Sequence, residues 1–175
     1  MACCNLYSVL LAAAVVLTTV PASARASSAH HLHFYMHDVL TGPHPTAAQV
    51  VNGTHGHFGD TTVIDDVLTQ TSSRSSPAVG RAQGQYMWAS SSSTGKKEKD
   101  PAFLVTMNVV LTSGPFAGSS VTVVGIDDLA VEVRELPVVG GTGKFRMARG
   151  YVLWKTVSRD QPNAVLELDV YVNNS

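Results

Sequence analysis

The chain has 175 residues, carries 12 basic and 13 acidic side chains for a net charge of −1, and is 45% hydrophobic. This apolar content argues against a disordered chain, and the lack of a basic excess argues against a nucleic-acid-binding protein. Valine (25 residues) and threonine (15) far outnumber isoleucine (2), and this composition favours strands over helices.

The first 26 residues have the pattern of a secretory signal peptide. The apolar run from Val9 to Leu17 is too short to span a bilayer, and small-residue cleavage patterns follow it at Ala22-Ser23-Ala24 and Ala24-Arg25-Ala26. We therefore expect residues 1–26 to be removed and residues 27–175 to form one secreted domain.

Both cysteines, Cys3 and Cys4, lie in this leader, so the expected mature domain has no thiol for a disulfide or a metal site. Asn52-Gly53-Thr54 is an N-glycosylation sequon in a turn-like stretch, in agreement with the secretory route. We expect a glycan at Asn52 of an extracellular protein.

Apolar and polar residues alternate along the mature chain in segments typical of β-strands. The segments are residues 31–37, 62–68, 79–89, 103–111, 120–125, 131–139, 144–157 and 165–172. Such short strands with Gly-rich turns predict an all-β single domain, either a sandwich or a closed antiparallel barrel. Gly80 and Gly84 share a face with Tyr86 and allow that strand to bend, which favours the barrel.

Asp38 is a candidate acid because it continues the apolar row of Leu32, Phe34 and Met36. Burial there would raise its pKa, so that the carboxyl group could donate or accept a proton. The alternative is an aspartate that caps the turn after the strand.

Arg149 interrupts a second row, in which Phe145, Met147 and Tyr151 are expected to share its face. A buried guanidinium needs a partner, and Asp38, a tyrosine hydroxyl or an anionic ligand would each serve. The alternative is an internal ion pair with a purely structural role.

Tyr86 and Trp88 share one face beside glycines and could line a slot for a planar ring, although an aromatic pair that fills the core is the simpler interpretation. His31-x-His33 and His55-x-His57 have the spacing of neighbouring metal ligands on a strand. We expect these histidines to be solvated or hydrogen-bonded, with no metal and no cofactor.

Several motifs, taken together and in order, resemble those of plant dirigent proteins, from about Leu32 to Val172. They are His33 to Asp38 with Thr41-Gly42, Phe58-Gly59, Asp65 to Thr69, Val79 to Gly84, and Val138 to Tyr151. The resemblance implies an eight-stranded antiparallel barrel similar to allene oxide cyclase, secretion to the apoplast or cell wall, and a homo-oligomer, a trimer more than a dimer.

The resemblance also implies site residues. Asp38 matches the pocket aspartate of the family, Tyr86 and Trp88 match its aromatic pair, and Arg149 matches the arginine of its Met-Ala-Arg-Gly motif. We expect Asp38, Tyr86 and Arg149 to take part in the chemistry, and the substrate contacts to be Phe34, Trp88, Lys144 and Phe145. Lys144 stands where lignan-forming members usually carry an acidic residue, which reverses the local charge.

The function implied is stereoselective coupling of monolignol phenoxy radicals, such as those of coniferyl alcohol, to lignans. The radicals would come from a laccase or peroxidase, since such a protein has no oxidative activity of its own. One alternative is a catalyst that cyclises or dehydrates quinone methides. The other is a non-catalytic phenolic-binding or cell-wall defence protein. For all of these functions we expect no nucleic-acid or membrane partner.

Overall fold

The structure is a computed structural model that describes residues 28–54, 56–91 and 101–174, so the expected signal peptide lies outside the described residues. The strands are β1 (Ser28–Asp38), β2 (Ala47–Val51), β3 (Thr61–Thr69), β4 (Ala78–Trp88), β5 (Ala102–Leu111), β6 (Ser120–Asp128), β7 (Val133–Thr142), β8 (Arg149–Asp160) and β9 (Asn163–Asn174). Two 3-10 turns, η2 (Gly114–Phe116) and η3 (Gly143–Phe145), join strands. Within these ranges no helix is long and apolar enough to cross a membrane.

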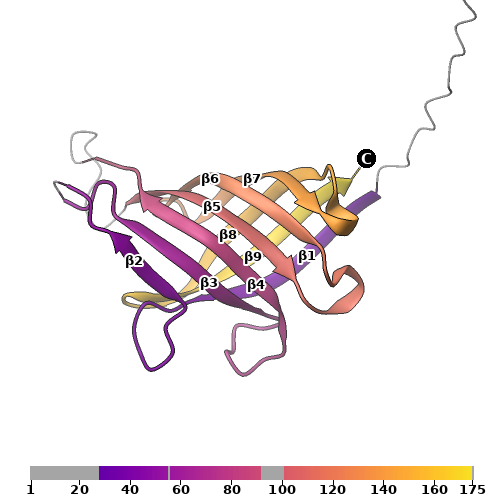
Figure 1. The fold of residues 1–175 in the computed structure, drawn as a ribbon, viewed down its shortest axis with the longest axis horizontal. Helices are drawn as coiled ribbons and strands as arrows, with labels where there is room; N and C mark the ends of the chain where they lie inside the picture. Colours follow the sequence, from indigo (N-terminus) through magenta and orange to yellow (C-terminus); the bar gives the residue numbers. More distant parts are fainter. Residues whose placement is uncertain (1–27, 55, 92–100, 175) are drawn as a thin grey trace, which may run out of the picture.

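The strands form one antiparallel sheet that closes on itself (Figure 1). Neighbours follow the order β1-β9-β8-β7-β6-β5-β4-β3, and pairing of residues 35–37 with residues 67–69 joins β1 to β3. The predicted eight-stranded antiparallel barrel is confirmed. β2 is an additional strand on the first half of β3. It was not predicted because only Ala47 of its five residues is buried, so the segment has no alternating pattern.

Inward-facing side chains of alternate residues fill the barrel. In β5, Val105, Met107 and Val109 are at most 2% exposed, while Thr106 and Asn108 between them face solvent. Adjacent strands approach closely at Gly84, where a Cβ atom would clash with the Thr106 carbonyl oxygen. Glycine is therefore required at this point of the β4–β5 contact.

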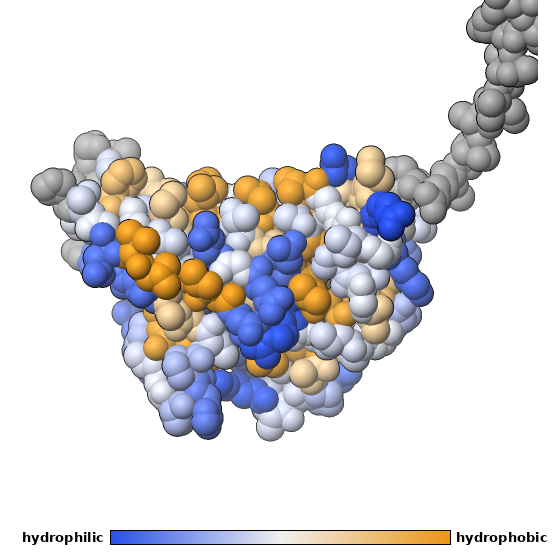
Figure 2. All heavy atoms as spheres, in the orientation of Figure 1, coloured by the Kyte–Doolittle hydropathy of each residue, from blue (hydrophilic) through white to orange (hydrophobic). Residues whose placement is uncertain are grey.

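Figure 2 shows a mixture of hydrophilic and hydrophobic side chains on the face that carries β3, β4 and β5. On the outside of β3 and β4, the exposed carboxylate of Asp65 accepts hydrogen bonds from Arg81 and Gln83. The outer surface of these strands is thus solvated, in contrast to the apolar interior.

The predicted strand 144–157 is shorter in the structure and its first part has a different phase. Residues 143–145 form η3, Met147 has a left-handed φ of 65°, and β8 begins only at Arg149. The expectation that Phe145, Met147, Arg149 and Tyr151 share one face is therefore wrong: Phe145 is fully buried, and the other three are exposed. A turn within the segment resets the alternation on which the prediction relied.

Candidate functional site

A cavity of about 430 Å³ lies at one end of the barrel. Its walls come from the last residues of β1, β4 and β8 and the first residues of β3, β5 and β9, which meet at one end because the strands are antiparallel. This is the end that carries β2, at the left in Figure 1. The opposite end is filled by η3, where the rings of Phe116 and Phe145 pack 4.9 Å apart. The cavity of about 430 Å³ thus lies at the end of the barrel opposite η3.

The carboxyl group of Asp38 lies in the cavity wall, as predicted for a buried acid. Asp38 is 8% exposed, and the Tyr86 hydroxyl donates a 3.2 Å hydrogen bond to its Oδ2 atom. Its Oδ1 atom has no hydrogen-bond partner among the described residues. Burial raises the pKa of Asp38 to about 6, partly offset by the Tyr86 hydrogen bond. Asp38 can therefore exchange a proton at mildly acidic pH.

Tyr86 lines the same cavity from β4. Burial, and then the negative charge of Asp38, raise the pKa of the Tyr86 phenol. The phenol therefore stays protonated and acts as a hydrogen-bond donor to Asp38 rather than as a base. Asp38 and Tyr86 form one proton-bearing pair contributed by two strands that are not neighbours in the sheet.

A second buried carboxyl group, Asp66 of β3, is close enough to Asp38 for the charge of Asp38 to raise its pKa. Burial, and then the charge of Asp38, raise the pKa of Asp66 to about 8. With Asp66 protonated, its O–H can donate to the Thr46 hydroxyl across 2.5 Å, and Thr46 can donate to the carbonyl oxygen of His37. At neutral pH the pair Asp38–Asp66 therefore carries one negative charge rather than two.

Asp66 was not predicted as a site residue, although the sequence contains a signal for it. Thr62, Ile64 and Leu68 share the inward face of β3 with Asp66, and all four are buried. A carboxylate in the middle of such a row is as unusual as Asp38 at the end of its own row.

A buried ion pair between Arg134 and Asp127 lies at another part of the cavity wall. Arg134 of β7 donates from Nε to Asp127 Oδ1 at 2.6 Å and from Nη2 to the Thr156 hydroxyl at 3.0 Å. The two ionic side chains are only 4% and 9% exposed, and Asp127 and Thr156 line the cavity. Burial raises the pKa of Asp127 despite the neighbouring Arg134. The buried arginine expected at Arg149 is thus found at Arg134.

Aromatic rings form one side of the cavity. Phe103 packs edge-on against Tyr86 at 5.3 Å and against Trp88 at 5.5 Å between ring centroids. Trp154 of β8 also lines the cavity and is 3% exposed, and its indole N–H has no acceptor within the described part of the chain. The indole N–H is thus a buried hydrogen-bond donor without a partner among the described residues beside the cavity, an arrangement that costs free energy.

The remaining predicted site residues lie elsewhere. Arg149 is exposed rather than buried, and it donates to the carbonyl oxygens of Val139 and Ala148 rather than to Asp38, one of the three partners considered for it. Lys144 donates to the Pro115 carbonyl oxygen at the closed end of the barrel.

Phe34 and Phe145, expected to contact substrate, are buried in the core and are not among the residues that line the cavity. Asn52 is exposed between β2 and β3, where it accepts a hydrogen bond from the Gln49 amide. Of the predicted set, the structure brings together Asp38, Tyr86 and Trp88.

Comparison with known proteins identifies similar chains over nearly the whole described domain. A family model described as Dirigent-like protein matches residues 29–173. Dirigent protein 1 of Arabidopsis thaliana is 42% identical over 176 residues, which cover 95% of this chain and 93% of that protein. Pterocarpan synthase 1 of Glycine max is 38% identical over 152 residues, covering 82% and 78%. The solved structure of a pterocarpan synthase dirigent protein superimposes with a TM-score of 0.76 at 35% identity, covering 85% of this chain and 91% of that one.

Proposed function

The chain belongs to the dirigent protein family, and from this premise we propose that it directs the stereochemistry of a quinone-methide reaction of phenolic phenylpropanoids in the cavity. The observation that carries the proposal is the Asp38–Tyr86 pair, a carboxyl group with a pKa of about 6 on the wall of an aromatic cavity. A separate laccase or peroxidase supplies the oxidised phenol. The quinone methides that form when two monolignol radicals couple, such as those of coniferyl alcohol, fall within this substrate class.

The reaction needs a proton at one end of the substrate and gives one back at the other. When a hydroxyl oxygen attacks the electrophilic carbon of a quinone methide, a C–O bond forms and the electron pair of the exocyclic double bond moves through the ring. The carbonyl oxygen then becomes a phenol oxygen and takes a proton from Asp38. The attacking hydroxyl loses its proton, which the Asp38 carboxylate accepts, so no oxidant is consumed. Such acid–base assistance typically contributes about 10²–10⁴-fold in rate.

Stereoselectivity requires only a small energy difference between two approaches. A tenfold preference for one mirror-image product corresponds to about 1.4 kcal/mol between the competing transition states. The rings of Tyr86, Trp88 and Phe103 can stack on a planar guest, and the Trp154 N–H can hold one of its oxygens. The cavity volume of about 430 Å³ is within the range of small-molecule sites.

A second candidate function is direct control of monolignol radical coupling to a lignan, without proton transfer by the protein. The aromatic side of the cavity favours it, because radical coupling has a low barrier and depends mainly on how two rings are held. Similarity to relatives that are named pterocarpan synthases supports the first candidate, since that name states that those proteins are synthases.

The test is chiral chromatography of the products formed from coniferyl alcohol and laccase, and from a panel of quinone-methide precursors, with and without the protein. We expect one enantiomer in excess with the wild type and with Asp65→Asn, whose carboxylate lies outside the barrel. Asp38→Asn should give a nearly racemic product. Full selectivity of Asp38→Asn would favour the second candidate, and binding without any selectivity would reduce the protein to a phenolic-binding or wall protein.

We also propose that the mature protein is secreted to the apoplast, is glycosylated at Asn52 and forms a homo-oligomer. A trimer is favoured over a dimer. The leader pattern, the exposed position of Asn52 and the exposed apolar side chains Ile126, Val133 and Val139 support this. N-terminal sequencing of the secreted protein, a mass shift after glycosidase treatment and light scattering test the three parts separately.

A further inference from the structure

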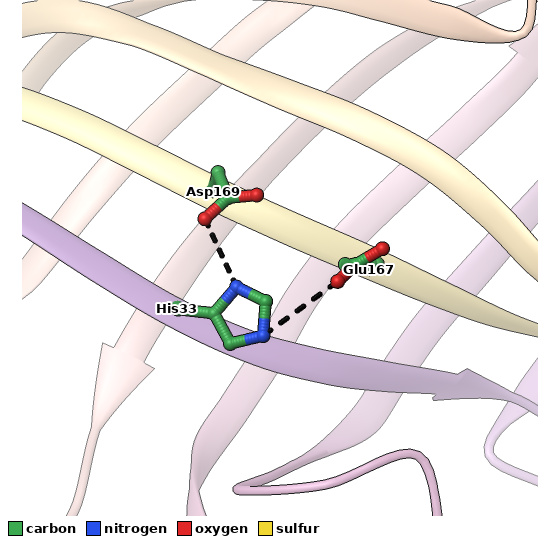
Figure 3. Close-up of side chains that lie close together, drawn as sticks. All are labelled: His33, Glu167 and Asp169. Atoms are coloured by element: carbon green, nitrogen blue, oxygen red, sulfur yellow. Dashed lines mark hydrogen bonds and ion pairs between the residues drawn. The ribbon is translucent and has the colours of Figure 1, made fainter.

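A cluster of imidazole and carboxylate groups lies on the outside of the barrel, on the paired strands β1 and β9. Figure 3 shows His33 on β1 facing Glu167 and Asp169 on β9. His33 pairs directly across the strands with Asp169, and Glu167 is two residues away on the same face. His31, two residues before His33, reaches the same Asp169 oxygen from the other side.

The distances within this cluster are short. His33 Nδ1 lies 2.9 Å from Asp169 Oδ1, His33 Nε2 lies 3.7 Å from Glu167 Oε1, and His31 Nε2 lies 2.7 Å from Asp169 Oδ1. One ligating atom from each of His33, Glu167 and Asp169 falls within 4.8 Å of the others. Their side chains are 38%, 28% and 29% exposed, so an ion from solvent has access to all three.

We propose that His33, Glu167 and Asp169, here called the β1–β9 site, bind a divalent transition-metal ion such as Zn²⁺. Zinc takes imidazole nitrogen and carboxylate oxygen ligands at about 2.0–2.2 Å, so that ligand atoms of a tetrahedral site stand roughly 3.4 Å apart. One ion can use only one of the two ring nitrogens of His33. One ligand atom from each of the three residues already lies within 4.8 Å of the others, so the side chains must move closer together to reach this value. An imidazole ligand disfavours Mg²⁺ and Ca²⁺, which prefer oxygen ligands in larger number.

Neighbouring side chains hold the ligands in place. The Tyr35 hydroxyl donates to Glu167 at 3.2 Å, and the Tyr35 ring packs edge-on against His33 at 5.2 Å. His31, which hydrogen-bonds Asp169, is itself stacked on the ring of Tyr171 at 4.4 Å. Carboxylate and imidazole partners of this kind orient metal ligands in proteins. The ligands also stand on paired strands rather than on a loop, which limits the entropy lost on binding.

The test is isothermal titration calorimetry of Zn²⁺ into the mature protein without a polyhistidine tag, in a buffer that does not bind metal. We expect one ion per chain, no competition from millimolar Mg²⁺, and an affinity at least about tenfold lower in His33→Ala and in Asp169→Asn. The matched control is His57→Ala, which removes an exposed histidine outside the β1–β9 site that lies 2.7 Å from the Asp60 carboxylate.

Thermal unfolding checks that each variant is folded, and Zn²⁺ should raise the unfolding temperature of the wild type and of His57→Ala but not of His33→Ala. The proposal is overturned if the wild type binds no Zn²⁺ up to about 1 mM. It is equally overturned if His33→Ala and Asp169→Asn bind as tightly as the wild type, or if His57→Ala alone loses the ion. None of these readouts depends on the phenolic reaction.

Discussion

The substitution Asp38→Asn should change how the stability of the barrel depends on pH. The pKa of Asp38 rises from its ordinary 3.8 to about 6 on folding, mainly through burial. Between these two values the folded protein binds a proton that the unfolded chain releases, so the free energy of unfolding falls as pH rises. Above about pH 6 the wild type carries the full cost of a buried charge, and the neutral asparagine avoids it.

The magnitude follows from the pKa difference. A difference of about two pH units corresponds to about 3 kcal/mol, because one unit is worth about 1.4 kcal/mol. Relative to the wild type, Asp38→Asn should therefore gain up to about 3 kcal/mol of stability between pH 4 and pH 7. Loss of the Asp38 charge also lowers the pKa of Asp66, since that charge is one cause of its rise to about 8.

The assay is urea unfolding of both proteins at several pH values between 4 and 7, because urea adds no ionic screening. Asp65→Asn is the control: hydrogen bonds from Arg81 hold the pKa of Asp65 below its ordinary 3.8, so this carboxylate is ionised in both the folded and unfolded states above about pH 4. The stability difference between Asp65→Asn and the wild type should therefore stay nearly constant between pH 4 and pH 7. A difference between Asp38→Asn and the wild type that stays constant to within about 0.5 kcal/mol across this range would refute the reasoning.

Four further predictions concern the cavity and its surroundings. Tyr86→Phe removes the hydrogen bond that lowers the pKa of Asp38, so the pH–rate profile of an acid-dependent reaction should extend to higher pH; an unmoved profile would separate Tyr86 from Asp38. Trp154→Phe should weaken binding of an oxygen-bearing phenol by about 2- to 10-fold in calorimetry, with no loss for a ligand that lacks the oxygen. Arg134→Met should cost about 3–5 kcal/mol in urea unfolding, and adding Asp127→Leu should restore much of it; equal costs for the single and double variants would contradict the ion-pair argument. Arg149→Ala should leave phenol affinity within about twofold, because the side chain is exposed and does not line the cavity; a larger loss would place it in the site.

The fold and half of the site could be predicted because both depend on alternation within strands. Asp38, Tyr86 and Trp88 each lie in a continuous strand, so their inward faces follow directly from period-2 counting. Arg149 could not be placed in this way, since the left-handed residue Met147 breaks the strand just before it.

Side-chain contacts between strands could not be predicted from the sequence for a different reason. Arg134 and Asp127 pair across a hairpin, and the register of that hairpin depends on the turn between the two strands. The charge of Asp38 raises the pKa of Asp66 only because pairing of β1 with β3 brings the two residues close together. Alternation can identify an inward carboxylate, but the group that it faces is decided by barrel closure.

The pairing of β1 with β9 has a consequence for how the protein folds. These strands pair along their whole length, from Ser28 opposite Asn174 to Asp38 opposite Ala164, although they lie at the two ends of the domain. The first strand therefore lacks this partner until the chain has been synthesised through β9, and closure of the barrel is expected to be slow because these contacts are far apart in sequence. During that interval the open edge of β1 is a natural target for chaperones, and also the segment most prone to pairing with another nascent copy.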